Sequence, residues 1–139
     1  MKFISKNPQE TIKFGQRLVK KLKVGDIVCL CGELGTGKTT FVKGMAKGLN
    51  VVAAKVSSPT FVLMNIYEGK LPLFHFDLYR LNNTKEIEAI GYEEFFYGNG
   101  IAVIEWAEKL EELMPKKYIK VALEHQGPQK RLITVSKFL

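Results

Sequence analysis

The first third of the chain has the hydrophobic pattern of a strand between two helices. Residues 7–22 place their apolar side chains on one helical face, with Asn7 as the N-cap and Pro8 at the first helical position. The run 26–31, DIVCLC, is nearly continuously apolar, which is typical of a strand that is buried on both faces. Residues 38–49 return to apolar positions three to four residues apart, which predicts an amphipathic second helix.

The middle of the chain has the pattern of a β-hairpin followed by a helix. Two runs rich in β-formers, residues 61–67 and 71–78, flank the short turn EGK, which predicts an antiparallel pair. Helical spacing follows, with Thr84 as the expected N-cap and an interruption at Gly91. A sheet that contains such a hairpin beside a parallel strand is mixed.

The last part of the chain predicts one more buried strand and a second hairpin. Residues 101–104 form an apolar strand that carries Glu105 at its carboxyl end, and the short helical stretch that follows closes before Pro115. Alternating residues on both sides of QGPQ indicate the final hairpin. The predicted fold class is therefore α/β, a single domain over residues 1–139 with a mixed central sheet flanked by helices.

Composition narrows the class of protein further. The 139 residues are 46% hydrophobic and 25% charged, which is ordinary for a globular chain of this length. No stretch approaches the ~18 apolar residues of a membrane span, and residues 1–14 lack the apolar core of a signal peptide. Cys29 and Cys31 lie two apart on one predicted strand, where they make a poor disulfide, so we expect reduced core residues. We expect a cytoplasmic protein without a membrane partner.

The net charge of +7 comes mainly from lysine, because only Arg17, Arg80 and Arg131 are arginines. Lysines cluster at residues 20–23 and again at residues 116–120. Such clusters can attract nucleic acid, or they can be a solvated face. A solvated lysine-rich face is the favoured interpretation, and a surface that attracts nucleic acid is the alternative.

The stretch GELGTGKT, residues 32–39, matches the P-loop template G-x-x-x-x-G-K-[ST] at every position and lies between the predicted strand and helix. Glycines let the loop turn its N–H groups inward, so that phosphate oxygens can approach them. Lys38 would reach the β- and γ-phosphates, and Thr39 would offer its hydroxyl to Mg²⁺. The expected ligand is nucleotide phosphate with Mg²⁺; the alternative is that the glycines only make a tight turn. The residues expected to bind nucleotide are Glu33, Leu34, Gly35, Thr36, Gly37, Lys38, Thr39 and Thr40.

Two predicted strands end in a carboxylate, at Asp77 and at Glu105. In an α/β sheet the ligand crevice lies at the carboxyl ends of the parallel strands. If both strands run parallel to the strand before the P-loop, these two carboxylates can hold Mg²⁺ and the attacking water. The alternative is a structural role in a turn or a salt bridge.

Four further residues are candidates near this site. Thr60 follows a proline and could reach the γ-phosphate or Mg²⁺ as a switch-loop threonine does. Strand alternation places His75, Asp77 and Tyr79 on one face, which favours a polar network over an isolated structural histidine. Trp106, the only tryptophan, either packs in the core or lies near the nucleotide.

The motifs GELGTGKTT, SSPTF, HFDLYR, GYEEFF and IEWAE, in this order and spacing, resemble the TsaE family over nearly the whole chain. The resemblance implies a cytoplasmic P-loop ATPase required for threonylcarbamoyladenosine modification of tRNA, at the adenosine next to the anticodon. It further implies Mg²⁺-dependent hydrolysis in complex with the partner proteins TsaB and TsaD, slow for the isolated chain, with any tRNA contact made through that complex.

By this resemblance each candidate receives a role. Lys38, Thr39 and Thr40 serve phosphate and metal, whereas Thr60, Asp77 and Glu105 serve metal and water. The expected catalytic residues are Lys38, Asp77 and Glu105, and the expected Mg²⁺ ligands are Thr39, Asp77 and Glu105. Tyr79, Arg80 and Trp106 occupy motif positions as well, with Trp106 among the nucleotide-binding residues.

Two other functions use the same loop. A small-molecule kinase needs a lid and several arginines to clamp the transferred phosphate, and this chain has three arginines. A nucleotide-dependent switch that does not hydrolyse is the other alternative. The acidic pair argues against a switch only if both carboxylates face the metal.

Overall fold

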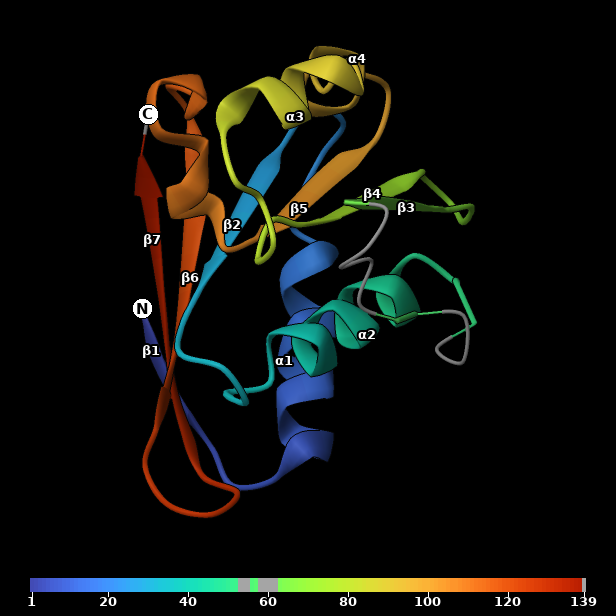
Figure 1. The fold of residues 1–139 in the computed structure, drawn as a ribbon. Coiled ribbons are helices and arrows are strands. Elements are labelled where there is room, and N and C mark those ends of the chain that lie inside the picture. Colours follow the sequence, from blue (N-terminus) through green and yellow to red (C-terminus); the bar gives the residue numbers. More distant parts are fainter. Residues whose placement is uncertain (53–55, 58–62, 139) are drawn as a thin grey trace.

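A mixed sheet forms the centre of the protein in a computed structural model that describes residues 1–52, 56–57 and 63–138. Within this part of the chain the sheet has seven strands in the order β1-β7-β6-β2-β5-β4-β3 (Figure 1). The strands are β1 Lys2–Ser5, β2 Ile27–Cys31, β3 Met64–Tyr67, β4 Leu73–Asp77, β5 Ile101–Glu105, β6 Tyr118–His125 and β7 Arg131–Phe138.

The four inner strands β6, β2, β5 and β4 run parallel, because β2 pairs in parallel with both β5 and β6, and β5 pairs in parallel with β4. The two predicted hairpins, β3–β4 and β6–β7, supply the antiparallel pairs, together with β1 against β7. The carboxyl ends of β2, β5 and β4 therefore lie at one edge of the sheet. Glu105 is level with Leu30 on one side and with Asp77 on the other.

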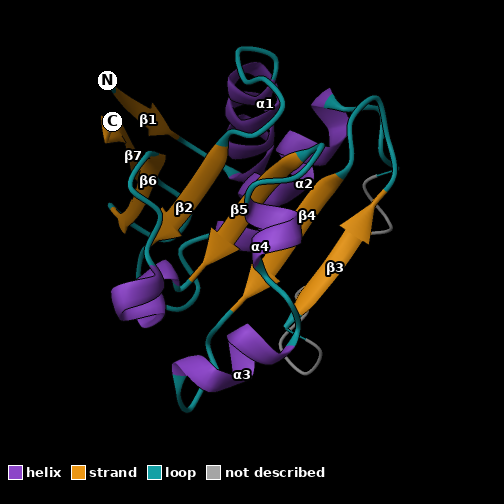
Figure 2. Cartoon of the chain, turned by 90° about the horizontal axis from the view of Figure 1, so that it is seen from above, coloured by secondary structure: helices purple, strands orange, loops and turns teal. Residues whose placement is uncertain are grey.

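Helices cover both faces of the sheet (Figure 2). The helices are α1 Pro8–Val19, α2 Lys38–Gly48, α3 Thr84–Ala89, α4 Glu93–Phe96 and the 3-10 helix η2 Ala107–Leu113. Alternate residues of β2 enter two separate cores: Val28 and Leu30 pack under α1 and α2, whereas Ile27 and Cys29 pack under α3, α4 and η2. This alternation explains the continuous apolar run, since a strand buried on both faces has no polar side.

Most predicted elements are confirmed, with shorter bounds. Asn7 caps α1, its side chain accepting the N–H of Glu10 at 2.9 Å. Gly91, at φ +69°, separates α3 from α4 as expected. The first hairpin has strands 64–67 and 73–77 in the described residues, and positions 61 and 62 of its predicted first strand lie outside them.

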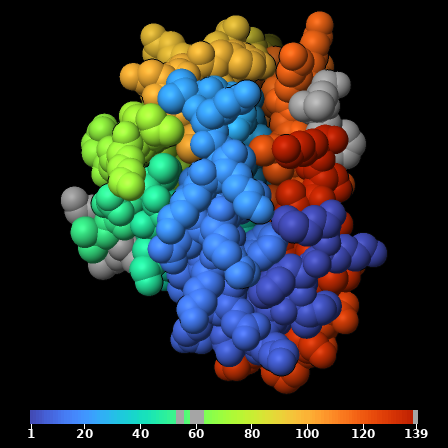
Figure 3. Space-filling model, turned by 180° about the vertical axis from the view of Figure 1, so that it is seen from behind, coloured from blue at the N-terminus to red at the C-terminus, as the bar shows by residue number. Residues whose placement is uncertain are grey.

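Two features of the pattern were misjudged. Thr84 is not the N-cap of α3: it is the first helical residue, and the Asn83 side chain accepts the N–H of Lys85 at 3.0 Å. An asparagine one position earlier offers the same acceptor, so the pattern did not separate the two. Strand β1 was not predicted, because four residues show little alternation by themselves. It forms by pairing with β7, far away in the sequence. Figure 3 shows the N-terminal segment, in dark blue, beside the C-terminal segment, in red.

The structure also bears on the expectations about membrane spans, cysteines and lysine clusters. No helix of the described residues is long and apolar enough to cross a bilayer. Cys29 and Cys31 are free thiols, and burial raises the pKa of Cys29 to about 12. The two lysine clusters meet at a cavity of about 490 Å³ near the start of β2, lined by Lys21, Lys23 and Lys117 among others. This cavity is at the end of β2 opposite the P-loop.

Candidate functional site

The P-loop connects the end of β2 to the start of α2, as its motif requires. Gly35 and Gly37 adopt φ +80° and +97°, where a side chain would strain the backbone. Gly32 is needed for space, because a Cβ there would lie 2.5 Å from the carbonyl oxygen of Leu123. Gly37 is also the N-cap residue of α2, and no side chain caps this helix. The first turn of α2 therefore has N–H groups available for an anion.

Lys38 lies along the inside of its own loop. Its Nζ donates to the carbonyl oxygens of Gly32 at 2.5 Å and Glu33 at 3.2 Å, and it lies 4.0 Å from the centre of the Trp106 ring. The residue is only 5% exposed. Burial lowers the pKa of the Lys38 amine, and the nearby carboxylate of Glu105 opposes that shift. A buried cation beside carbonyl oxygens and carboxylates is suited to bind an added phosphate.

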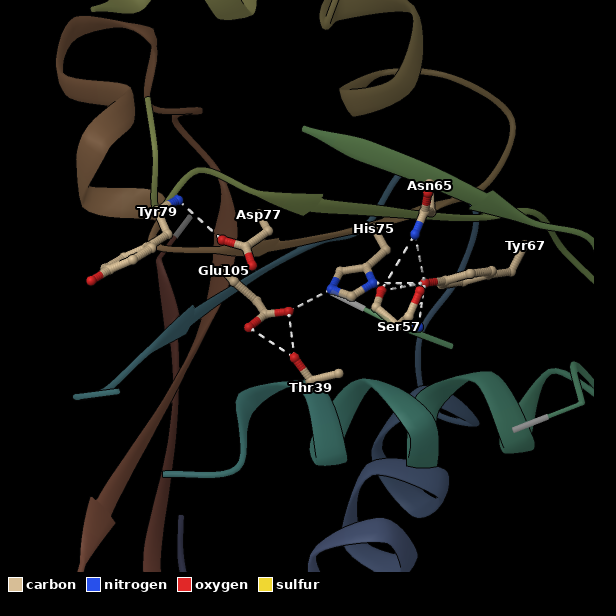
Figure 4. A network of polar contacts seen from close by, with 8 residues as sticks. All are labelled: Thr39, Ser57, Asn65, Tyr67, His75, Asp77, Tyr79 and Glu105. Atoms are coloured by element: carbon tan, nitrogen blue, oxygen red, sulfur yellow. Dashed lines mark hydrogen bonds and ion pairs between the residues drawn. The ribbon is translucent and has the colours of Figure 1, made fainter. Parts of the chain in front are cut away.

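The acidic half of the site meets the P-loop at the first turn of α2. Thr39 Oγ1 donates to the Glu105 carboxylate at 3.2 and 3.3 Å from its two oxygens (Figure 4). Asp77 lies beside Glu105 on the neighbouring strand, and its Oδ1 accepts the N–H of Tyr79 at 3.0 Å. Both carboxylates are buried. Strands β4 and β5 run parallel to β2, as a shared role of Asp77 and Glu105 in one site requires.

A cavity of about 390 Å³ joins these groups. Its lining residues are Leu34, Gly35, Gly37, Lys38, Thr39, Thr40, Asp77, Tyr79, Glu105 and Trp106. A larger cavity of about 510 Å³ between β1 and α1 is lined by apolar and basic residues only, so it offers no carboxylate to a cation.

The residues of this cavity fit Mg²⁺ with a nucleotide. One hydroxyl and two carboxylates supply the hard oxygen ligands that Mg²⁺ prefers. Within the described residues no group of three or more His, Cys, Asp or Glu side chains forms a metal site. Phosphate oxygens and water would complete the shell of a bound Mg²⁺, which is how Mg²⁺ is usually bound in P-loop sites.

Other predicted residues divide between the cavity and its surroundings. Trp106 adopts φ +60°, and its ring lies 5.1 Å from that of Tyr79, so both aromatic residues border the cavity. Arg80 is exposed and does not line it. Glu33 and Thr36 do not line it either, because the Thr36 hydroxyl donates back to the Glu33 carbonyl oxygen at 2.8 Å. Thr60 lies outside the described residues.

Sequence reasoning missed Arg131, which holds the P-loop from β7. Its Nε donates to the Thr36 carbonyl oxygen at 3.0 Å, and its Nη2 donates to that of Gly35 at 3.3 Å. A trans peptide directs its N–H opposite to its C=O, so this bond turns the Gly37 N–H away from Arg131. A lone arginine 95 positions from its partner leaves no local signal in the sequence.

We expect Arg131→Gln to weaken ATP binding by up to about tenfold, ~1.4 kcal/mol, because the loop loses two backbone anchors. Calorimetric titration with ATP measures the change. Arg17→Gln is the matched control, since Arg17 lies over the rings of Phe3 and Phe14 and does not contact the loop. Equal affinities for the two variants would show that the anchors are dispensable.

Comparison with known proteins identifies relatives over nearly the whole chain. A sequence model of the family described as "Threonylcarbamoyl adenosine biosynthesis protein TsaE" matches residues 5–133. The TsaE proteins of Bacillus subtilis and Treponema pallidum are 39% and 38% identical, over 96% and 98% of this chain and 84% and 100% of theirs. The crystal structure of YdiB from Bacillus subtilis superposes with a TM-score of 0.81 at 33% identity, covering 99% of this chain and 84% of that one. The chain therefore belongs to the TsaE family of tRNA threonylcarbamoyladenosine biosynthesis proteins.

Proposed function

We propose that this TsaE-family chain binds ATP with Mg²⁺ in the cavity and hydrolyses it during threonylcarbamoyladenosine biosynthesis. One observation carries the proposal: the Thr39 hydroxyl contacts the Glu105 carboxylate next to the buried Lys38 amine. P-loop hydrolases need this set of groups, because the cation neutralises phosphate charge while the hydroxyl and carboxylate hold the metal.

The residues divide the work of hydrolysis between binding and catalysis. The P-loop N–H groups and Lys38 bind the β- and γ-phosphates and stabilise the charge on them. Thr39 and the carboxylates of Asp77 and Glu105 hold Mg²⁺, which supplies positive charge at the phosphate oxygens when bound. One of these two carboxylates orients water toward the γ-phosphate. The Trp106 ring lies against the Lys38 amine and lines the same cavity.

Partner proteins complete the proposal. The resemblance implies TsaB and TsaD as partners, with tRNA reached through their complex, and it implies a cytoplasmic location. The cavity residues support a need for partners, because no arginine lines the cavity as the structure describes it. Since the described lining supplies no arginine finger, the isolated chain should hydrolyse ATP slowly.

The absence of arginine from the described cavity lining also disfavours a small-molecule kinase. Phosphoryl transfer to a second substrate needs arginines around the transferred group, and two of the three arginines are engaged elsewhere. Arg17 lies over aromatic rings and Arg131 holds loop carbonyls. A switch without hydrolysis is disfavoured by the two carboxylates that line the cavity with Lys38 and Thr39.

Arg80 provides the test of partner dependence. It is exposed three residues after Asp77, so a docked partner can contact it beside the metal-binding carboxylates. We expect Arg80→Ala to remove most of the stimulation of ATP turnover by TsaB and TsaD, with ATP affinity nearly unchanged. Turnover is measured for wild type and variant, alone and with both partners.

The control for this test is Lys85→Ala, which removes a positive charge on nearby α3. Its stimulation should equal that of wild type. Equal stimulation of the Arg80 variant would refute the role given to Arg80. An absence of stimulation in wild type would count against a partner-dependent hydrolase.

A further inference from the structure

His75 is a buried polar residue in the middle of β4, and both of its ring nitrogens have partners (Figure 4). Nε2 lies 2.5 Å from Oε2 of Glu105, and Nδ1 lies 3.0 Å from the hydroxyl of Tyr67. The ring therefore bridges the metal-binding carboxylate and the neighbouring strand β3. Strand alternation had placed His75 on the polar face, but its partners are not the expected Asp77 and Tyr79.

Tyr67 is itself held in place. Its hydroxyl lies 3.1 Å from the carbonyl oxygen of Ser57 and accepts the N–H of the same residue at 3.3 Å. The amide of Asn65 lies 3.4 Å away. Within the described residues no buried side-chain nitrogen or oxygen lacks a hydrogen-bond partner. The result is a continuous chain of contacts from Thr39 through Glu105, His75 and Tyr67 to the Ser57 backbone.

The direction of one bond follows from the chemistry of the groups. An ionised carboxylate can only accept, so the proton between His75 and Glu105 belongs to Nε2. This assignment holds whether the single Tyr67 hydroxyl proton is directed to Nδ1 or to the Ser57 carbonyl oxygen. The imidazole thus fixes one oxygen of Glu105 by a charge-assisted bond, and Thr39 contacts the same carboxylate.

We propose that His75 is a positioning residue that holds the Glu105 carboxylate against the Thr39 hydroxyl before Mg²⁺ and nucleotide bind. Tyr67 orients the imidazole by fixing Nδ1. The inference rests on the proposed role of Glu105 toward metal and water. Hydrogen-bond partners of metal ligands commonly change metal affinity or activity 10–100-fold when they are removed.

Two substitutions distinguish the contribution of Nε2 from that of Nδ1. The amide of His75→Gln reaches the former position of Nε2 and can still donate to Glu105, whereas that of His75→Asn reaches only the position of Nδ1. We expect the Asn variant to lose kcat 10–100-fold with little change in KM for ATP, and the Gln variant to recover most of that loss. His125→Asn, at the exposed end of β6, is the matched control and should behave as wild type.

A second readout does not depend on hydrolysis. ATP affinity is measured with Mg²⁺ and again with EDTA, for wild type and both His75 variants. The gain in affinity from Mg²⁺ should shrink in the Asn variant and return in the Gln variant, with equal affinities in EDTA. The chain has two histidines, so NMR of the labelled imidazoles adds a direct check: His75 should show a solvent-protected Nε2–H, which exposed His125 lacks.

The outcomes distinguish the two hypotheses. The positioning role would be overturned if the folded Asn and Gln variants kept the kcat of wild type and the same gain in ATP affinity from Mg²⁺. It would also be overturned if the imidazole proton of His75 exchanged as fast as that of His125. Absence of hydrolysis in wild type would overturn the proposed function instead. In that case, the gain in ATP affinity that Mg²⁺ gives to each variant still decides whether His75 positions Glu105.

Discussion

Lys38→Ala should abolish tight ATP binding, raising Kd at least about hundredfold, ~2.7 kcal/mol, while the chain stays folded. The buried amine is the cation that faces the phosphate site from inside the loop, and the P-loop N–H groups alone do not replace its charge. Among the described residues, its amine donates only to the carbonyl oxygens of Gly32 and Glu33, which water can satisfy after truncation.

Calorimetric titration of ATP into the folded variant measures this effect. Lys47→Ala is the matched control, because it removes the same charge from the exposed last turn of the same helix. Its affinity should stay within about twofold of wild type, as expected for a screened surface charge. An unchanged Kd for folded Lys38→Ala would overturn the nucleotide site.

Glu105→Gln should reduce single-turnover hydrolysis at saturating ATP by at least about tenfold, ~1.4 kcal/mol of barrier. The substitution keeps the shape of the side chain but removes the charge that faces Mg²⁺ and water in the proposed mechanism, so catalysis should fall more than affinity. Asp77→Asn should act in the same direction, since the two carboxylates are level on adjacent strands.

Rapid-quench measurements of phosphate formation give the single-turnover rate. Glu108→Gln is the control: this carboxylate influences the pKa of Lys38, yet it is exposed and does not line the cavity. Its rate should remain near that of wild type. Rates near wild type for both Glu105→Gln and Asp77→Asn would assign these residues a structural role.

The parts of the site predicted from sequence are those that local pattern determines. A strand, a glycine loop and a helix follow one another in the chain, so the P-loop is complete within residues 26–49. Asp77 and Glu105 were predictable because each ends an apolar strand, and parallel strands end at one edge. Their parallel direction became known only from the pairing of β4 with β5 and of β5 with β2.

The missed contacts depend on register between distant strands. His75 is level with Val103 in the ladder and reaches Glu105 along the diagonal, a relationship that alternation within one strand cannot specify. Arg131 reaches the P-loop because β7 folds back along β6, next to β2. Strand β1 likewise exists through its pairing with β7. Each of these features joins segments that are remote in the sequence.

The measurement that tests the account most directly is single-turnover phosphate release from ATP by the wild-type chain, with Mg²⁺ or EDTA, alone and with TsaB and TsaD. The account predicts slow release by the isolated chain, faster release with both partners, and loss of release in EDTA and in Lys38→Ala. Undiminished release in EDTA or in Lys38→Ala would contradict it, as would transfer of the phosphate to a small acceptor in place of water.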